Sequence, residues 1–360
     1  MRHAAWASRV SPSQPRPTLA ERASRRLQEE WLTGGALSAS LLPLSWLYGG
    51  LLALRRLAYA TGFKRVERLP VPVIVVGNWI VGGAGKTPTT LALLELLRAR
   101  GLRAGVVSRG YGREEDGIGL VTRVSTAREV GDEPLLLHLR GRVPVAVGRE
   151  RVAAARALLA AEPGLQVLVS DDGLQHWRLP RQLSVLVFDE RGLGNGRLLP
   201  AGPLRQRPQP LAPDEVVVYN APQASTGLPG HVAERRLAGA VTLADWWAGQ
   251  PARMDTLLAL RHQPGLLAVA GVARPQRFFD MLAGLGLQLQ TLALPDHADF
   301  AALPWAADVP GIVLTEKDAV KLPPSRVGDL PVWVVALDFA PGAGFEAALD
   351  DHLPTLLRRA

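Results

Sequence analysis

The stretch VPVIVVGNWIVGGAGKTPTTLALLELL, residues Val71 to Leu97, decides the fold. It begins as an apolar run rich in valine and isoleucine, breaks into glycines, and continues after Lys86 and Thr87 as a leucine-rich helix pattern. A strand, a glycine loop, Lys-Thr and a helix in this order predict a phosphate-binding P-loop. The glycines let backbone N–H groups converge on phosphate oxygens, and the helix N-terminus adds the positive end of its dipole.

In such a loop Lys86 reaches the β- and γ-phosphates of ATP, and the Thr87 hydroxyl holds Mg²⁺. The loop departs from the usual pattern G-x-x-x-x-G-K-[ST], because Ile80 stands at the position of the first glycine and the leading glycine is Gly77. The alternative interpretation is a glycine-rich turn that binds nothing. The predicted nucleotide-binding residues are Gly82, Gly83, Ala84, Gly85, Lys86, Thr87 and Pro88.

Composition and charge limit the classes of function. The 360 residues suffice for two domains, and the absence of cysteine excludes disulfides and thiolate metal sites and suits a cytosolic location. A formal charge of +8 attracts nucleic acid, anionic membranes or phosphorylated substrates. Aromatic residues are sparse and are not interleaved with basic ones, so we expect no nucleic-acid partner. Nothing indicates an obligate protein partner.

The segment before the P-loop predicts an attachment to a membrane. Residues 1–34 form an N-terminal extension with a short charged helix at 19–32, and residues 35–54 carry no charge. A helix of about twenty residues matches the thickness of a bilayer core. Arg55 and Arg56 close the predicted membrane helix, 35–56, and favour a cytoplasmic location for the residues on its C-terminal side. Serines, glycines and Pro43 leave open whether the segment spans the membrane, lies in its interface, or is a buried core helix.

The rest of the chain alternates short strands with helices, which predicts an α/β fold with a mostly parallel sheet. We expect a P-loop domain over residues 65–224 and a smaller C-terminal α/β domain over 225–360. Chemistry gathers at the C-terminal ends of such strands. Strands are predicted at 102–107, 145–148, 167–169, 184–188, 216–219, 266–270, 287–293, 312–314 and 332–336, and a last helix at 345–357 that Pro354 interrupts near its end.

Carboxylates follow two of these segments. Asp171 comes after an apolar strand, and an acidic residue there holds Mg²⁺ opposite Thr87 in P-loop enzymes. Asp132 and Glu133 are candidates for a general base and for a helper at the metal. The alternatives are a turn at Asp171-Asp172-Gly173 and a helix start at Asp132, because acidic residues suit both.

Basic residues and a histidine complete the candidate site. Arg109 and Arg113 lie on the glycine-bearing segment SRGYGR, which either clamps an anion or is a solvated turn. His297 lies between two aspartates and is either a tuned base or a surface histidine. Glu316, Lys317 and Asp318 either line the site or are solvated. We predict substrate contacts among Arg109, Arg113, Asp172, His176 and Arg178.

Together these motifs make the sequence similar to the tetraacyldisaccharide 4'-kinase family, the lipid A 4'-kinases. The motifs that carry the resemblance occur in the family's order between residues 71 and 321, and the apolar segment 35–54 lies where the family has its membrane helix. They are GNWIVGGAGKTP (Gly77–Pro88), SRGYGR (Ser108–Arg113), VGDEP (Val130–Pro134), DDGLQH (Asp171–His176), LPAGPLR (Leu199–Arg205), GVARPQRFF (Gly271–Phe279), PDHADF (Pro295–Phe300) and TEKDAVK (Thr315–Lys321).

The resemblance implies an enzyme that transfers the γ-phosphate of ATP to the 4'-hydroxyl of a lipid A disaccharide 1-phosphate precursor. It implies Mg²⁺ as the metal and a location at the cytoplasmic face of the inner membrane. It also implies that Asp132, paired with His297, is the catalytic base, with Lys86 at the phosphates. A membrane-associated P-loop ATPase acting as a switch stays as the alternative.

The sequence departs from the family pattern at single positions. Ala84 stands where the loop often has threonine, Gln206 where an acidic residue is common, and Ala298 where a second histidine often follows His297. The resemblance does not account for the first thirty or so residues.

Overall fold

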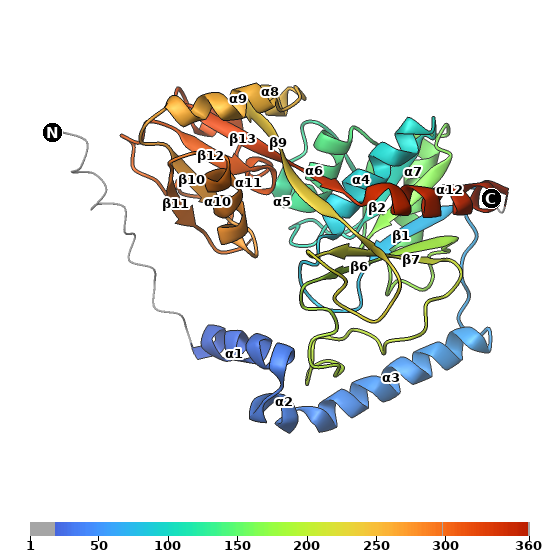
Figure 1. The fold of residues 1–360 in the computed structure, drawn as a ribbon. Helices are drawn as coiled ribbons and strands as arrows, with labels where there is room; N and C mark the ends of the chain where they lie inside the picture. The colour runs from blue at the N-terminus through green and yellow to red at the C-terminus, as the bar shows by residue number, and fades with distance from the viewer. Residues whose placement is uncertain (1–18, 297, 359–360) are drawn as a thin grey trace. The chain divides into compact units, whose positions relative to one another are not determined.

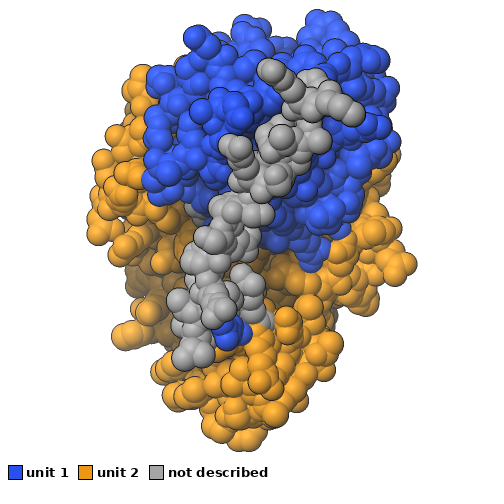
Figure 2. Space-filling view, turned by 90° about the vertical axis from the view of Figure 1, so that its left-hand side faces the viewer, with its two compact units in different colours: residues 1–22, 237–337 blue, residues 23–236, 338–360 orange. Residues whose placement is uncertain are grey.

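The computed structural model describes residues 19–296 and 298–358 (Figure 1). It is an α/β structure with two sheets and two compact units, coloured separately in Figure 2. Of the described residues, unit 1 contains 19–22, 237–296 and 298–337, and unit 2 contains 23–236 and 338–358. The sequence suggested a domain boundary near residue 225. The units divide at Arg236 and Leu237 instead, and residues 338–358 belong to the unit that holds the glycine loop.

Unit 2 is built on an eight-stranded sheet with the order β3-β4-β2-β5-β1-β6-β7-β8. The paired strands run parallel except β3, which is antiparallel to β4. The central strand β1 is buried at every position, as the apolar run predicted. The strands are β1 (Val73–Gly77), β2 (Ala104–Ser108), β3 (Gly119–Val121), β4 (Val145–Val147), β5 (Val167–Asp171), β6 (Leu183–Asp189), β7 (Glu215–Asn220) and β8 (His231–Val232).

Helices cover both faces of this sheet. Val73 and Val75 of β1 share a core cluster with Val152 and Leu158 of α7. Successive strand residues point to opposite faces of a sheet, so Ile74 and Val76 face the side opposite to Val73 and Val75. On that side α4 packs against β1, β2 and β5 and lies beside α6. The helices are α4 (Lys86–Ala99), α5 (Ala127–Val130), α6 (Asp132–Gly141), α7 (Arg151–Ala161) and α12 (Gly342–Arg358), the last packed on β7 and β8.

The prediction that Pro354 interrupts the last helix is wrong, because α12 continues through it to Arg358. Proline removes one backbone N–H from the helical ladder. The next turn still buries Leu356, and Leu353 is buried directly before the proline. Burying these leucines favours continuation of the helix over the single lost hydrogen bond.

The N-terminal apolar segment differs from the single helix that the sequence predicted. It forms α2 (Ala36–Ser40) and α3 (Leu42–Ala60), which follow α1 (Leu19–Thr33). The break at Leu41 places Pro43 in the first turn of α3, where its missing N–H leaves no bond unmade. Within residues 19–296 and 298–358, none of the helices has the length and apolar character needed to cross a bilayer.

Helices α2 and α3 turn their polar side toward the rest of unit 2. Hydroxyls of Ser38, Ser45 and Tyr48 donate to backbone carbonyls of Ala201, Leu198 and Arg205, and the indole of Trp31 donates to Pro200. These carbonyls all belong to one loop, residues 198–205. The opposite side of α3 carries exposed apolar side chains. They are Leu44, Trp46, Leu47, Leu51, Leu54 and Leu57.

Unit 1 contains most of a five-stranded sheet with the order β11-β10-β12-β13-β9. The strand β9 is nine residues long, in a stretch that the sequence left without a pattern, because ERRLAGAVT alternates only weakly. The hydrophobic core of unit 1 includes Leu257, Phe278 and Val313. The elements are β9 (Glu234–Thr242), β10 (Leu267–Ala270), β11 (Gln290–Ala293), β12 (Ile312–Thr315), β13 (Val332–Ala340), α8 (Leu243–Trp247), α9 (Met254–Ala259), α10 (Pro275–Gly284), α11 (Glu316–Ala319) and the 3₁₀ turns η1 (Leu260–His262) and η2 (Pro324–Arg326).

Candidate functional site

The glycine loop, residues 77–88, leaves the end of β1 and enters α4. Gly85 caps α4 with φ 97°, a left-handed conformation that favours glycine. The first half of the loop forms a short antiparallel pairing instead of a wide turn. Val81 N donates to Pro203 O at 2.9 Å, Arg205 N donates to Trp79 O at 2.7 Å, and Ile80 bridges Leu204. The buried Ile80 therefore occupies an extended position, which explains why no glycine stands there.

Lys86 is the first residue of α4, and its side chain turns back to the glycine loop. Its Nζ is 3.4 Å from the Gly82 carbonyl oxygen, 3.5 Å from Asn78 Oδ1 and 3.8 Å from Asp172 Oδ1. Arg205 donates through Nη1 to both oxygens of Asp172, at 2.9 and 3.2 Å. Asp172 thus lies between two cations, and its φ of 50° is left-handed. Sequence reasoning placed Lys86 and Asp172 in the site but missed Arg205, because its motif gave no chemical reason to choose it.

Asp171 ends β5 next to β1, and it is almost fully buried. Thr90 of α4 donates to Asp171 Oδ1 at 3.0 Å, so the carboxylate faces the first turns of the helix that begins with Lys86 and Thr87. Burial, with the nearby Glu133 and Asp172 carboxylates, raises the pKa of Asp171 from 3.8 to about 7, against the opposing effects of Lys86 and the Thr90 hydrogen bond. A buried carboxylate among like charges is a site that a cation would stabilise.

Asp132 and Glu133 begin α6, so these carboxylates do start a helix. The Glu133 N–H donates to Asp132 Oδ1 at 3.0 Å, and the positive end of the helix dipole favours both anions. The preceding Gly131 has φ 93°, and a Cβ on it would lie 3.1 Å from the Gly110 Cα. The two glycines therefore let the segments 108–113 and 130–134 touch through their backbones, which brings Arg109 and Asp132 into one region.

The other residues that the sequence offered as site candidates have different surroundings in the structure. Arg109 is exposed, and Arg113 donates to the Gly117 carbonyl within its own loop. His297 lies outside the described residues, so its pairing with Asp132 stays a prediction. Glu316 and Asp318 are buried within unit 1, against the solvated interpretation: Glu316 accepts from Trp246, and Asp318 accepts from the Gly271 N–H and pairs with Lys321.

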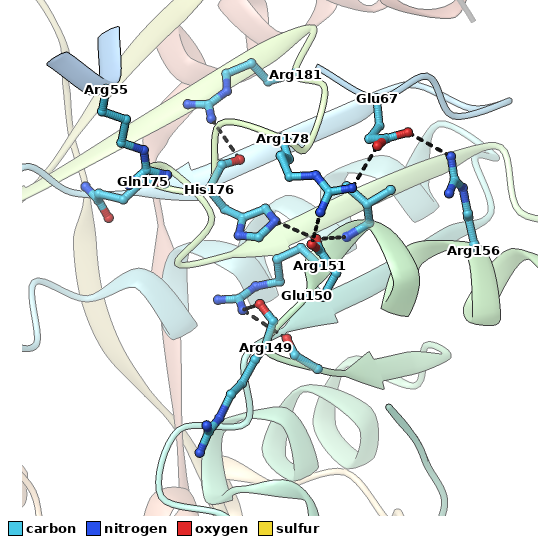
Figure 3. Close-up of polar contacts among 12 residues, drawn as sticks. Arg55, Glu67, Arg149, Glu150, Arg151, Arg156, Gln175, His176, Arg178 and Arg181 are labelled. Atoms are coloured by element: carbon cyan, nitrogen blue, oxygen red, sulfur yellow. Dashed lines mark hydrogen bonds and ion pairs between the residues drawn. The ribbon is translucent and has the colours of Figure 1, made fainter. Parts of the chain in front are cut away.

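His176 and Arg178 belong to a polar network centred on Glu150 (Figure 3). His176 Nε2 lies 3.0 Å from Glu150 Oε1, Arg178 pairs with Glu150 and with Glu67, and Glu67 also accepts from Arg156 at 3.0 Å. Burial lowers the pKa of His176, although the Glu150 hydrogen bond opposes this, so its neutral form is favoured. In this structure both predicted substrate contacts are held by carboxylates, and their role at a substrate stays a prediction.

Arg151 is a site feature that sequence reasoning missed. It is buried at the start of α7, donates to the Gly148 carbonyl at 3.0 Å, and has an Nε with no partner among the described residues (Figure 3). Burial lowers its pKa to about 10, with Asp172 opposing the shift. Within the described residues no group of three or more His, Cys, Asp or Glu side chains is arranged to hold a metal.

The sequence matches a family of known proteins over most of its length. A family model described as tetraacyldisaccharide-1-P 4'-kinase matches residues 37–354. A tetraacyldisaccharide 4'-kinase of Methylibium petroleiphilum is 53% identical over 342 residues, 92% of this chain and 94% of its own. One of Leptothrix cholodnii is 52% identical over 93% of this chain and 97% of its own.

A crystal structure of apo-form LpxK from Aquifex aeolicus in complex with ATP is similar in fold. It has a TM-score of 0.72 and 27% sequence identity, and covers 88% of this chain and 99% of its own. The order of motifs, the glycine loop beside paired aspartates and these matches over nearly the whole length lead to one conclusion. The chain belongs to the tetraacyldisaccharide-1-phosphate 4'-kinase family.

Proposed function

We propose that this chain is an ATP-dependent lipid kinase that phosphorylates the 4'-hydroxyl of a tetraacyldisaccharide 1-phosphate in lipid A biosynthesis. The observation that carries the proposal is the meeting, at one edge of the sheet, of a glycine loop with Lys86 and two strand-end aspartates. Family membership supplies the acceptor. The eight-stranded sheet is then a P-loop core, with the nucleotide at its C-terminal edge.

The glycine loop binds the nucleotide phosphates. Backbone N–H groups of residues 82–85 and the N-terminus of α4 face the β- and γ-phosphates. Lys86, which contacts the Gly82 carbonyl in this structure, turns to the phosphate oxygens and neutralises their charge.

The residues beside the loop fit Mg²⁺. Asp171 is a buried carboxylate whose pKa is raised by burial and by Glu133, and the Thr87 hydroxyl is buried on the first turn of α4. Mg²⁺ takes few protein oxygens and completes its shell with water and phosphate, so this small donor set suits it. Thr87 and Asp171 would hold the ion, with Glu133 near it, and the ion would neutralise charge on the transferring phosphoryl group.

The chemical step needs a base for the sugar hydroxyl. As the bond from the γ-phosphorus to ADP breaks, a bond to the 4'-oxygen forms, and the hydroxyl proton must leave. Asp132 accepts it, supported by His297, and α6 fixes the Asp132 carboxylate through the Glu133 N–H. Arg109, Arg113, His176 and Arg178 are the candidates for contacting the acceptor and its 1-phosphate.

The function is tested by incubating the protein with ATP, Mg²⁺ and a tetraacyldisaccharide 1-phosphate in detergent, followed by mass spectrometry. The expected product is the lipid with a mass gain of one phosphate. Release of inorganic phosphate without a phosphorylated lipid would instead favour the ATPase switch.

We also propose that α3 lies in the interface of the inner membrane, with the catalytic units on the cytoplasmic face. The support is its inverted polarity: hydroxyls bond inward to loop 198–205, while leucines and Trp46 face outward. Such an apolar stripe binds a bilayer surface. The exposed Lys64 and Arg65, a few residues after its end, favour anionic headgroups.

Replacing Leu47 and Leu51 together by glutamine is expected to weaken binding to anionic vesicles by about a hundredfold or more. Each leucine is more than half exposed, and burying one leucine contributes about 1.5–3 kcal/mol. Vesicle sedimentation measures the partitioning. Val124→Gln is the control, because Val124 is 89% exposed but is not on α3, and it should bind vesicles like the wild type. Equal binding by the double variant and wild type would refute the interfacial helix.

A further inference from the structure

Two side chains hold carbonyl groups of the glycine loop from the side opposite its carboxylates. Asn220, the last residue of β7, donates through Nδ2 to the Ala84 carbonyl at 2.8 Å. Arg191, just after β6, donates through Nη1 to the Val81 carbonyl at 3.2 Å. In the sheet β1 has β5 on one side and β6 then β7 on the other. The loop therefore has Asp171 and Asp172 on its β5 side and these two donors on its β6–β7 side.

Each of these donors is itself fixed by a second partner. The buried Asn220 accepts from Arg235 Nε at 2.7 Å, which leaves its amide N–H₂ facing Ala84. Asp189, buried at the end of β6, accepts from Arg191 Nε at 3.0 Å with both oxygens and from the Arg191 backbone N–H at 3.0 Å. These second partners restrict the orientations that the two donors can adopt.

Because the peptide bond is planar, holding a carbonyl also fixes the direction of the N–H group of the next residue. In a trans peptide the carbonyl of one residue and the N–H of the next point in opposite directions. Holding the Ala84 carbonyl toward β7 therefore turns the Gly85 N–H toward the β5 side, and holding the Val81 carbonyl toward β6 does the same for the Gly82 N–H. That is the side on which Lys86 and Asp172 lie.

The glycines agree with this arrangement. Gly82 and Gly85 have φ of 93° and 97°, so each peptide can turn without strain. A Cβ on Gly85 would lie 2.1 Å from Asn220 Nδ2, which leaves no room for a side chain between the loop and this donor. The loop and its donors are thus in direct contact, and neither can move far alone.

We propose that Asn220 and Arg191 are positioning residues of the phosphate site, which aim the Gly85 and Gly82 amides at the nucleotide phosphates by holding the carbonyls on the other side of the same peptides. This rests on the proposed function, because it takes the glycine loop as the ATP site. Neither residue touches the nucleotide. Their effect is on phosphate affinity, since a loop aimed beforehand loses less conformational freedom on binding.

The test is the dissociation constant of ATP, measured by calorimetric titration without lipid on full-length Asn220→Ala and Asn220→Asp. Both lose the donor to Ala84, and we expect roughly tenfold weaker ATP binding in each, with adenosine binding unchanged, since adenosine has no phosphates. Arg191→Met should behave in the same way. In the lipid assay the KM for ATP should rise with the dissociation constant, and the KM for the lipid should not change.

Arg98→Met is the matched control. Arg98 lies at the C-terminal end of α4, remote from the glycine loop, and donates to the carbonyl of Gly141 at the end of α6. Loss of this bond should leave ATP affinity unchanged. ATP binding within twofold of wild type in Asn220→Ala would overturn the proposal. So would weakening by Asn220→Asp alone, which would indicate added charge, or an equal weakening of adenosine, which would indicate general damage. Failure of the wild type to phosphorylate the lipid while binding ATP would refute the proposed function and leave this inference standing.

Discussion

Asp132→Asn is expected to lower kcat by about 10²- to 10⁴-fold while ATP affinity stays within about twofold of wild type. A positioned general base contributes an acceleration of this size, and asparagine cannot accept the proton of the sugar hydroxyl. The substitution is otherwise conservative. Asparagine keeps the size of the side chain and an oxygen that can accept from the Glu133 N–H, now at 3.0 Å from Asp132, so α6 should begin as before.

Steady-state kinetics with the lipid and titration with ATP measure the two quantities separately. Glu129→Gln is the control, because Glu129 is an exposed acidic residue in the neighbouring α5, where it closes a capping box with Thr126 that glutamine preserves. Its kcat should equal that of wild type. If Asp132→Asn instead weakens ATP binding by as much as it lowers kcat, Asp132 is a ligand of the metal or nucleotide and not the base.

Asp171→Asn is expected to inactivate the enzyme and to stabilise the protein. Activity should fall by at least about a hundredfold, because a bound metal supplies several kcal/mol of transition-state stabilisation and Asp171 is its one buried carboxylate ligand in our proposal. In EDTA and without nucleotide, the free energy of unfolding at pH 8 should rise by about 2–4 kcal/mol. The rise in the pKa of Asp171 from 3.8 to about 7 corresponds to roughly 4 kcal/mol at most.

The sign of this effect follows from the raised pKa. The folded state favours the protonated carboxyl, so this group lowers stability progressively as pH rises from 3.8 toward 7, and fully above that. The gain from Asp171→Asn should therefore shrink as pH falls from 8 to 5, and Mg²⁺ with ATP should reduce it at pH 8.

Denaturant unfolding in EDTA at the two pH values measures the gain. Asp189→Asn provides the contrast: Asp189 is also buried at a strand end but is paired with Arg191, so removing its charge should destabilise the fold. A less stable Asp171→Asn protein at pH 8 would show that the carboxylate is stabilised in the folded state and would contradict the charge argument.

The strand β1, the glycine loop and helix α4 could be predicted from the sequence, because their patterns lie within one short stretch of the chain. The apolar run before Gly77 became β1, and the leucine pattern after Lys86 became α4, with Leu93, Leu94 and Leu97 in the core. Since parallel strands end at one edge of a sheet, Asp171 could be placed near the glycine loop from its position after a strand. Family motifs then gave the activity.

The parts that the sequence did not predict depend on contacts distant in the chain. Nothing near Asn220 indicates that it bonds Ala84, and Arg205 reaches Asp172 across a long separation in sequence. Backbone carbonyls accept from any suitable donor, so such contacts have no sequence pattern. The return of residues 338–358 to unit 2 also has no local sequence signal, because it depends on how α12 packs on β7 and β8.

The bonds between α2, α3 and loop 198–205 bear on how a detergent-free form of this protein should be made. Deleting the N-terminal sixty residues would remove the donors that Ser38, Ser45 and Tyr48 provide to that loop. Pro203 and Arg205 of the same loop pair with Val81 and Trp79, so the deletion would loosen the glycine loop itself. If α3 lies in the membrane interface as proposed, keeping the helix and replacing its outward leucines by polar residues should retain those bonds and give a protein that is active without detergent.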